Sequence, residues 1–199
     1  PNVADFYVVV LLDGYDYGYA LQPAVATALQ GFVASGCGLV TTEWIAYDVC
    51  QGYKGAIIGD LLPVTMPVCS DYGEVDTWTV DVPGHPLVAG LPASWIDDAG
   101  WSTVTAKPGA EVVVSGTAGN PMVVASNAAG GTVVYLNQDM TYTTSTINAN
   151  AVQLVVNATA YASCAEQVPD AIPALSGWGI ALMSILVIVG AVWALRRAA

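Results

Sequence analysis

The most constraining feature of this sequence is an uninterrupted apolar stretch near its C-terminus. The 18 residues from Trp178 to Leu195 carry no charge, and Arg196 and Arg197 follow at once. A helix of this length just crosses a hydrocarbon core of about 30 Å. Trp178 and Trp193 stand near its two ends, where indole rings favour the membrane interface, and the arginine pair predicts a cytoplasmic C-terminus. Because the stretch is apolar on every side, we predict a transmembrane helix with a basic end over residues 177–199, rather than a buried core helix.

A membrane helix at the C-terminus places the preceding chain outside the cytoplasm. The sequence opens at Pro1 without an initiator Met or a basic segment, so we expect a processed chain that has lost a signal peptide, and residues besides it. The four cysteines contain no CxxC pair, which favours disulfides over zinc or redox sites. These features predict a bacterial cell-envelope protein on the periplasmic or cell-surface side.

The tail resembles the IPTL-CTERM sorting segment of Gram-negative bacteria. Residues 172–179 read IPALSGWG, close to the usual opening IPTLSEWG, with Ala174 and Gly177 as the departures, and the apolar helix and arginine pair follow in the expected order. The resemblance implies surface sorting and a sorting protease as a partner. A plain membrane anchor is the alternative, and the two differ in whether the helix is retained. Residues 165–176 form the linker that carries the motif.

Charge narrows the range of partners. The chain has 16 acidic and 4 basic residues, for a formal net charge of −12. Before the terminal helix only Lys54 and Lys107 are basic. Such a domain repels phosphate backbones, so we expect no nucleic-acid binding, and cationic partners are favoured.

Residues 1–164 have the pattern of one α/β domain. Asp5 to Leu12 is a nearly continuous apolar run, typical of a strand buried on both faces. Tyr19 to Ser35 has helical periodicity and stops before Gly36, and Gly38 to Ala46 resumes as a strand. This order predicts a right-handed βαβ crossover. We therefore expect a three-layer, flavodoxin-like, open and mostly parallel sheet, to which the transmembrane helix is appended.

The second half of the domain reads as further strands and a closing helix. Gly119-Asn120-Pro121 and Ala129-Gly130-Gly131 provide turns between strands. Gly84 to Trp95 is predicted to be a loop with a short helical turn. The predicted strands are Val75–Val82, Thr103–Ala106, Ala110–Ser115, Met122–Asn127 and Gly131–Asn137, and Ile147–Ala162 is the predicted closing helix.

These segments resemble the ThuA-like branch of the class I glutamine amidotransferase-like superfamily. The resemblance is carried by ADFYVVVLLD at 4–13, GFVASGCGLVTTEW at 31–44, GHPLVAGLP at 84–92 and GTVVYLNQD at 131–139. In that family a strand, a helix and another strand normally precede the segment that matches Asp5–Leu12, and here only four residues do. The resemblance thus implies that this strand lies nearer a sheet edge.

The resemblance also bears on catalysis. Amidotransferases of this superfamily carry a Cys in the turn after the strand that ends near Glu43, and this stretch, residues 41–44, has none. Cys37 lies at the beginning of that strand, the wrong end for a nucleophile. With His85 as the single histidine, neither a Cys-His dyad nor a Ser-His-Asp triad is supported. We therefore expect no catalytic residues and favour a non-enzymatic function.

Four acidic residues follow predicted strand ends: Asp13, Asp16, Glu43 and Asp139. In an open α/β sheet those ends border the usual ligand crevice, and carboxylates there could bind a ligand or a hard cation such as Ca²⁺. The alternative is that they are solvated loop acids, and no other cofactor is expected. The numerous tyrosines could line a sugar site or serve as ordinary core and surface aromatics.

The predicted topology also pairs the cysteines. Cys37 opens its strand and Cys164 ends the last helix, which in a βαβ sheet puts both at the same end. Cys50 and Cys69 belong to the opposite end. We predict disulfides Cys37–Cys164 and Cys50–Cys69 among the three arrangements that four cysteines allow.

Three classes of function remain. The first is a non-catalytic structural or interaction protein of the cell envelope that forms a homo-oligomer. Its support is the predicted edge strand and the close small-residue spacings Gly177/Ala181 and Gly190/Ala194 in the terminal helix. The second is a carbohydrate or small-ligand binding module, and the third is a hydrolase that uses Glu43 and Asp139.

Overall fold

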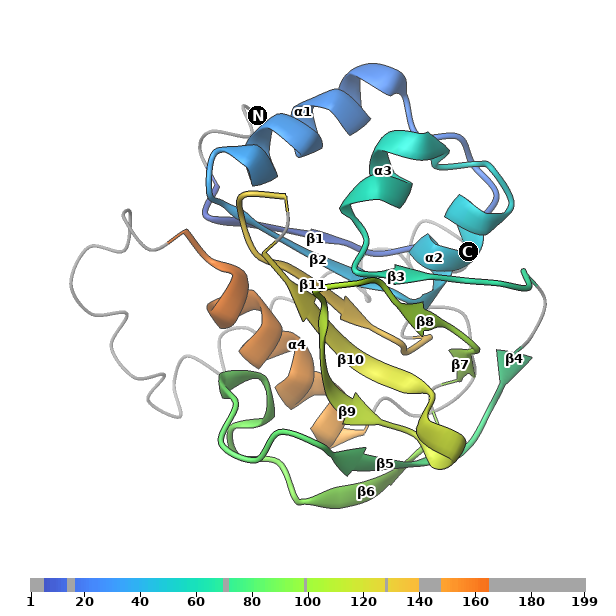
Figure 1. Ribbon diagram of the computed structural model, residues 1–199, viewed down its shortest axis with the longest axis vertical. Helices are drawn as coiled ribbons and strands as arrows, with labels where there is room; N and C mark the ends of the chain where they lie inside the picture. The colour runs from blue at the N-terminus through green and yellow to red at the C-terminus, as the bar shows by residue number, and fades with distance from the viewer. Residues whose placement is uncertain are drawn as a thin grey trace, which may run out of the picture. The chain divides into compact units, whose positions relative to one another are not determined.

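Seven strands form one mixed sheet in the order β1-β2-β11-β10-β9-β5-β6 (Figure 1). The computed structural model describes residues 6–13, 17–69, 72–98, 100–127, 129–139 and 148–164. The strands of the sheet are β1 (Val8–Leu11), β2 (Gly38–Thr42), β5 (Asp76–Val80), β6 (Ser94–Asp97), β9 (Glu111–Ser115), β10 (Pro121–Ser126) and β11 (Val133–Leu136). Two further pairs are β3 (Val64–Thr65) with β8 (Thr105–Ala106), and β4 (Tyr72–Gly73) with β7 (Trp101–Ser102).

The predicted βαβ crossover is present. β1 pairs in parallel with β2, and β2 in parallel with β11. The helix α1 (Pro23–Ala34) connects the first two strands. Four successive residues of β1, all aliphatic, are half-buried, while all five of β2 are buried. The burial of β2 follows from its position between two strands and two helical layers.

The expectation of a mostly parallel sheet is wrong. The pairings of β10 with β11, β10 with β9, β9 with β5, and β5 with β6 are all antiparallel. The connections explain the two pairings of β10. Only residues 116–120, which include the short helix η3 (Thr117–Gly119), join β9 to β10, and residues 127–132 join β10 to β11. A parallel crossover needs a dozen or more residues, so links this short make hairpins.

Helices cover both faces of the sheet, as a three-layer fold requires. α1, α2 (Glu43–Cys50) and α3 (Gly55–Leu61) lie on one face, and α4 (Ala149–Ala162) lies on the other (Figure 1). Successive residues of β2 point to opposite layers: Leu39 packs in the core with α1, and Val40 in the core with α4. The short helix η2 (Pro86–Val88) joins the α4 layer, as the predicted helical turn in that loop.

Several boundaries differ from the expectations. The strand predicted to reach Ala46 ends at Thr42, and α2 begins there without a loop. Of the strand predicted over 103–106, only residues 105–106 form a strand, β8, and β6, β7 and α3 were not predicted. α1 begins at Pro23 rather than Tyr19, since Pro favours the first helical position. α4 begins at Ala149, where the Asn148 side chain accepts the N–H of Ala151 at 2.9 Å.

The predicted membrane segment lies outside the described residues, together with the linker 165–176 and Trp178, Trp193, Arg196 and Arg197. Within the described part of the chain, no helix combines the length and the apolarity that a membrane crossing needs.

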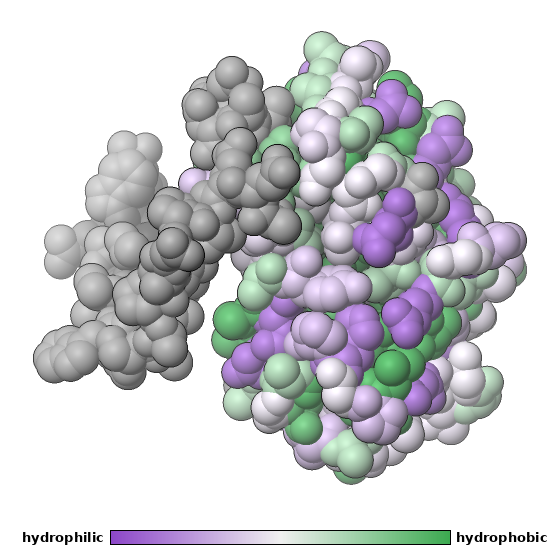
Figure 2. Space-filling view, turned by 60° about the vertical axis from the view of Figure 1, so that its left-hand side comes forward, coloured by the Kyte–Doolittle hydropathy of each residue, from purple (hydrophilic) through white to green (hydrophobic). Residues whose placement is uncertain are grey.

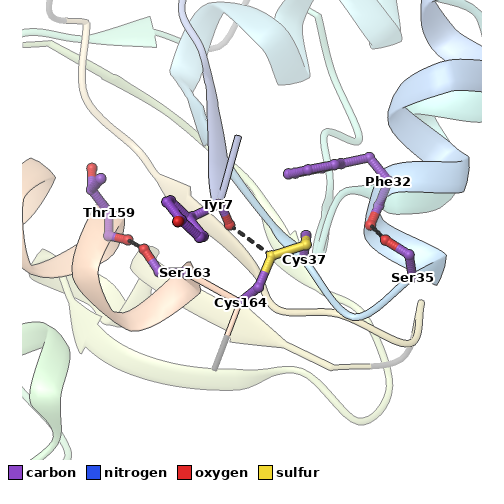
Figure 3. Close-up of a disulfide and its surroundings, with 7 residues drawn as sticks. All are labelled: Tyr7, Phe32, Ser35, Cys37, Thr159, Ser163 and Cys164. Atoms are coloured by element: carbon purple, nitrogen blue, oxygen red, sulfur yellow. Dashed lines mark hydrogen bonds between the residues drawn. A yellow bond between two sulfur atoms is a disulfide. The ribbon is translucent and has the colours of Figure 1, made fainter. Parts of the chain in front are cut away.

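Both predicted disulfides are present. Cys37 is bonded to Cys164 with a Cα–Cα distance of 4.5 Å, and Cys50 to Cys69 with 5.6 Å. Figure 3 shows the first bridge at the beginning of β1, where the C=O of Tyr7 lies beside the bridge and accepts the backbone N–H of Cys164 at 3.1 Å. The bridge therefore fixes the end of α4 to the start of β2.

Candidate functional site

Two of the predicted carboxylates meet where β2 and β11 end. Glu43 is the first residue of α2, directly after β2, and Asp139 follows β11. Each is only 1% exposed. The two segments are joined because Glu43 N donates to Gln138 O at 3.4 Å. The pair thus occupies the position at the carboxyl ends of parallel strands where ligands bind in open α/β sheets.

The two-stranded sheet of β4 and β7 supplies hydroxyl groups to both carboxylates. The hydroxyl of Ser102 in β7 donates a hydrogen bond to Glu43 Oε1. Tyr72 in the paired strand β4 hydrogen-bonds to Asp139. Gly100, just before β7, has φ +75°, and a Cβ there would lie 2.1 Å from the Tyr72 hydroxyl oxygen. The β4–β7 pair consequently packs onto the two acids, and only glycine fits at its closest approach.

The carboxamide of Asn137 fastens this arrangement. Its Oδ1 accepts from Ser102 N and from the Tyr135 hydroxyl, each at 3.1 Å. Its Nδ2 donates to Ser102 O at 2.8 Å and to Pro121 O at 3.0 Å. Asn137 is fully buried, so its side chain makes its hydrogen bonds within the protein and not to solvent. The crevice above β2 and β11 is filled by the chain's own residues.

Burial governs the electrostatics of the pair. Desolvation, opposed by the Ser102 hydrogen bond and assisted by the charges of Asp139 and Asp48, raises the pKa of Glu43 from 4.5 to about 7. Desolvation and the nearby charges of Asp139 and Glu43 raise the pKa of Tyr72 to about 12. Glu43 Oε2 has no hydrogen-bond partner within the residues that the structure describes. A carboxyl with these properties exchanges a proton near neutral pH.

Asp13 does not join this pair. It forms an ion pair with Lys54, which also pairs with Asp48 at 2.9 Å and donates to Tyr19 O at 2.8 Å. Asp48 in turn accepts the backbone N–H of Gly18 at 3.0 Å. These contacts hold the segment after β1 against α2 and α3. Asp16, the fourth predicted acid, lies outside the described residues.

Among the residues that the structure describes, no group of three or more His, Cys, Asp or Glu side chains is arranged to hold a metal ion. A cation such as Ca²⁺ at Glu43 and Asp139 stays a prediction. Lys107, the other lysine of the domain, donates to the carbonyls at the end of α3, with Asp60 O at 3.5 Å.

An aromatic group lies on the first turns of α2, beside Glu43. Tyr17 stacks on Trp44 with ring centroids 4.7 Å apart, and both contact Tyr47 edge to face, at 5.9 and 5.1 Å. Tyr17 is 40% exposed. Three of the chain's aromatics thus form one cluster at this end of the sheet.

The residues that would make a nucleophile–base pair lie elsewhere. Cys37 is oxidised in its disulfide. His85 Nδ1 accepts the N–H of Leu87 at 3.1 Å, and its ring packs against Tyr161 with centroids 4.9 Å apart. His85 therefore shapes η2, and the described residues contain no Cys-His dyad.

Ser102, Tyr72 and Asn137 were not anticipated from the sequence. Ser102 and Tyr72 belong to two-residue strands, too short for any periodicity. Asn137 carried a signal that could have been used, since an amide directly after a buried apolar strand needs internal partners.

Comparison with known proteins supports both predicted resemblances. Residues 170–197 match the IPTL-CTERM motif, which indicates an exported protein sorted to the cell envelope or surface. No curated protein matches the chain. Among solved structures, a cytoplasmic protein from Salmonella typhimurium superposes with a TM-score of 0.66 at 19% identity, covering 82% of this chain and 76% of that one.

A ThuA-like protein from Bacteroides uniformis superposes with a TM-score of 0.60 at 19% identity, over 78% of this chain and 69% of that one. The domain has a ThuA-like fold. The same ThuA-like fold matches part of the β-galactosidase from Bacillus circulans sp. alkalophilus, with a TM-score of 0.57 at 17% identity, over 80% of this chain and 23% of that enzyme. At these identities the likeness concerns the fold alone.

Proposed function

We propose that this protein is a non-catalytic interaction or structural protein of the cell envelope, surface-sorted through its tail, whose ThuA-like domain assembles with copies of itself. The observation that carries the proposal is the edge of the sheet at β1. Its four residues, Val8–Leu11, include neither a charge nor a proline. Phe6, Tyr7 and Leu12 beside it are 44, 40 and 48% exposed. Monomeric proteins usually protect edge strands with charged residues or prolines, so an apolar edge without them favours pairing with another chain.

The filled crevice supports the non-catalytic part of the proposal. Glu43 and Asp139 are buried beside β4–β7, where Glu43 Oε1 already accepts the Ser102 hydroxyl and Asp139 is hydrogen-bonded to Tyr72. A substrate would have to displace those segments before it could reach either acid.

The remaining surface limits other modes of association. On the face shown in Figure 2, hydrophilic side chains are interspersed with small hydrophobic groups. Lys54 and Lys107 are both engaged with acceptors of their own domain. Within the described part of the chain the exposed charges are therefore chiefly acidic, which opposes association except where an uncharged contact is available. Salt or divalent cations should strengthen assembly by screening this repulsion.

The proposal is tested by the native mass of the full-length protein in mild detergent. Leu12→Glu adds a charge beside β1 and should lower the assembled fraction at least tenfold. Ile96→Glu is the matched control, since it adds the same charge to the 70% exposed Ile96 on the opposite edge strand, β6. A wild-type protein that stays monomeric at every salt and Ca²⁺ concentration would refute self-assembly.

A further inference from the structure

A hollow lies between α2, α3 and the segment that contains β3, which stand together in Figure 1. Its volume is about 330 Å³, within the range of small-molecule pockets. Aliphatic side chains form much of its wall, among them Val49 of α2 and Leu62 and Val64 at the start of β3. Its charged groups are Asp60 of α3 and Lys107, which follows β8. A largely apolar wall with a few polar groups is typical of a site for a small organic molecule.

The walls of this hollow are held by a covalent bridge and by close packing of the two helices. Cys50, the last residue of α2, is bonded to Cys69, so the bridge ties the chain beyond β3 to the end of α2. A Cβ at Gly59 of α3 would lie 3.0 Å from Cγ1 of Val49, so the two helices already approach closely there. The hollow is therefore preformed, which lowers the entropy cost of binding a ligand.

Lys107 supplies the positive charge of the hollow. Its backbone N–H donates to Pro63 O at 2.9 Å. Its ammonium group donates to the carbonyls of Gly59 and Asp60, the latter at 3.5 Å. A lysine has three N–H donors, so the two carbonyls leave one for a ligand. Within the described chain, no carboxylate forms an ion pair with this ammonium group.

The other lysine of the domain has the opposite surroundings. Burial alone would lower the pKa of Lys54, but hydrogen bonds to Asp13 and Asp48 and their charges raise it. Desolvation lowers the pKa of Lys107, and the charge of Asp60 offsets this only in part. Lys107 is thus a cation at a largely apolar surface whose charge is incompletely balanced, and a bound anion would balance it.

We infer that this hollow binds a small carboxylic acid with an apolar chain, whose carboxylate contacts Lys107 and whose chain packs against Val49, Leu62 and Val64. A hydrogen bond between ammonium and carboxylate is charge-assisted and therefore stronger than a neutral one. The exposed Asp60 beside it repels anions, which favours a ligand with a single negative charge over one with two. The site is separate from Glu43 and Asp139, and it goes beyond the assembly proposed above.

Hexanoate is a suitable probe, and the methylation rate of Lys107 reports on its binding. Full-length protein in mild detergent is treated with formaldehyde and a borane reductant at pH 7, and the peptides are measured by mass spectrometry. Saturating hexanoate should slow methylation of Lys107 at least fivefold, because a bound carboxylate stabilises the protonated amine. The rate at Lys54 should stay unchanged, because that amine is already ion-paired.

Two related compounds separate the contributions of charge and chain. Hexanol has the chain without the carboxylate, and acetate has the carboxylate without the chain. Each should slow methylation of Lys107 less than twofold at the same free concentration, measured by dialysis against protein-free detergent. Equal protection by acetate would overturn the apolar part of the site, and equal protection by hexanol would overturn the contact with Lys107.

A substitution in the wall tests the location. Ala56 is an exposed residue of α3 that lines the hollow. Ala56→Leu should narrow it and abolish protection by hexanoate, while methylation of Lys107 without ligand continues. Ala24→Leu makes the same change at an exposed position of α1 and should keep the protection. Absence of protection in the wild type, or full protection in Ala56→Leu, would reject the site. Neither result bears on self-assembly, which the native mass measures.

Discussion

The hydroxyl of Ser102 donates a hydrogen bond to Oε1 of the buried Glu43, and this bond joins the β4–β7 pair to the end of the central strands. It opposes the desolvation that raises the pKa of Glu43, but does not cancel it. The acid is therefore a source of pH-dependent stability.

Stability should fall as the pH rises through the range in which Glu43 ionises. The pKa of Glu43 is about 7 in the folded protein and 4.5 in the unfolded chain. Below pH 4.5 the carboxyl is protonated in both states, and its penalty is absent. Between pH 4.5 and 7 the unfolded state loses the proton first, so the penalty grows and is complete above pH 7. The difference corresponds to about 3 kcal/mol.

Glu43→Gln should remove this pH dependence, because glutamine can still accept the Ser102 hydrogen bond and carries no charge. Urea unfolding at pH 5 and pH 8 measures the change. Asp98→Asn, at an exposed position, serves as the control and should keep the wild-type slope. An unaltered slope in Glu43→Gln would show that the acid is not the titrating group.

Gly100→Ala should destabilise the domain by about 3 kcal/mol. The added Cβ meets the Tyr72 hydroxyl oxygen at 2.1 Å, on a residue with φ +75°. Gly109→Ala separates the two causes, since Gly109 has φ +83° with nothing within 4 Å. It should lose only the conformational cost, about 1 kcal/mol. Equal losses in chemical denaturation would contradict the close contact at Gly100.

Asn137→Asp should cost about 3 kcal/mol or more at neutral pH. The change keeps the shape but replaces two N–H donors with an oxygen that faces the carbonyls of Ser102 and Pro121. Asn127→Asp makes the same chemical change at an exposed position and should be nearly neutral. Thermal melting followed by circular dichroism compares them. A small effect at Asn137 would mean that water or a rearranged β4–β7 pair replaces these bonds.

The two disulfides should differ in their contribution. Cys37–Cys164 closes a loop of 127 residues and Cys50–Cys69 one of 19. Chain entropy alone predicts about 5 kcal/mol for the longer loop and about 3 kcal/mol for the shorter. The double variant Cys37→Ser/Cys164→Ser should therefore unfold at lower urea than Cys50→Ser/Cys69→Ser. The reverse order would indicate that the region around Cys50 depends on its bridge for native packing.

The parallel part of the fold was predictable because its strands are apolar runs separated by a helix long enough to cross the sheet. The same topology gave the disulfides, since it places Cys37 and Cys164 at one end. The antiparallel part was misjudged, although the short connections on either side of β10 required hairpins. α3 was missed because Gly55 and Gly59 interrupt its helical pattern.

The site was predictable only in part. Because Glu43 and Asp139 each follow a strand, the sequence correctly predicted that they lie at the same edge of the sheet. The same reasoning wrongly grouped Asp13 with them. Asp13 pairs instead with Lys54, a contact across 41 residues that no local sequence pattern indicates. The covering by Ser102 and Tyr72 likewise depends on tertiary packing of strands only two residues long.

The bridge between Cys37 and Cys164 also determines how the domain would bear tension. Any pull transmitted through the tail reaches the domain at Cys164, and the covalent link passes it to the residue next to β2, which is hydrogen-bonded on both sides. Without the bridge, the same pull would act on the end of α4 and could peel that helix from the sheet turn by turn. With it, the load falls along β2, where many hydrogen bonds must shear at once. In oxidising surroundings the bridge would therefore let the domain resist a load applied at its C-terminal end.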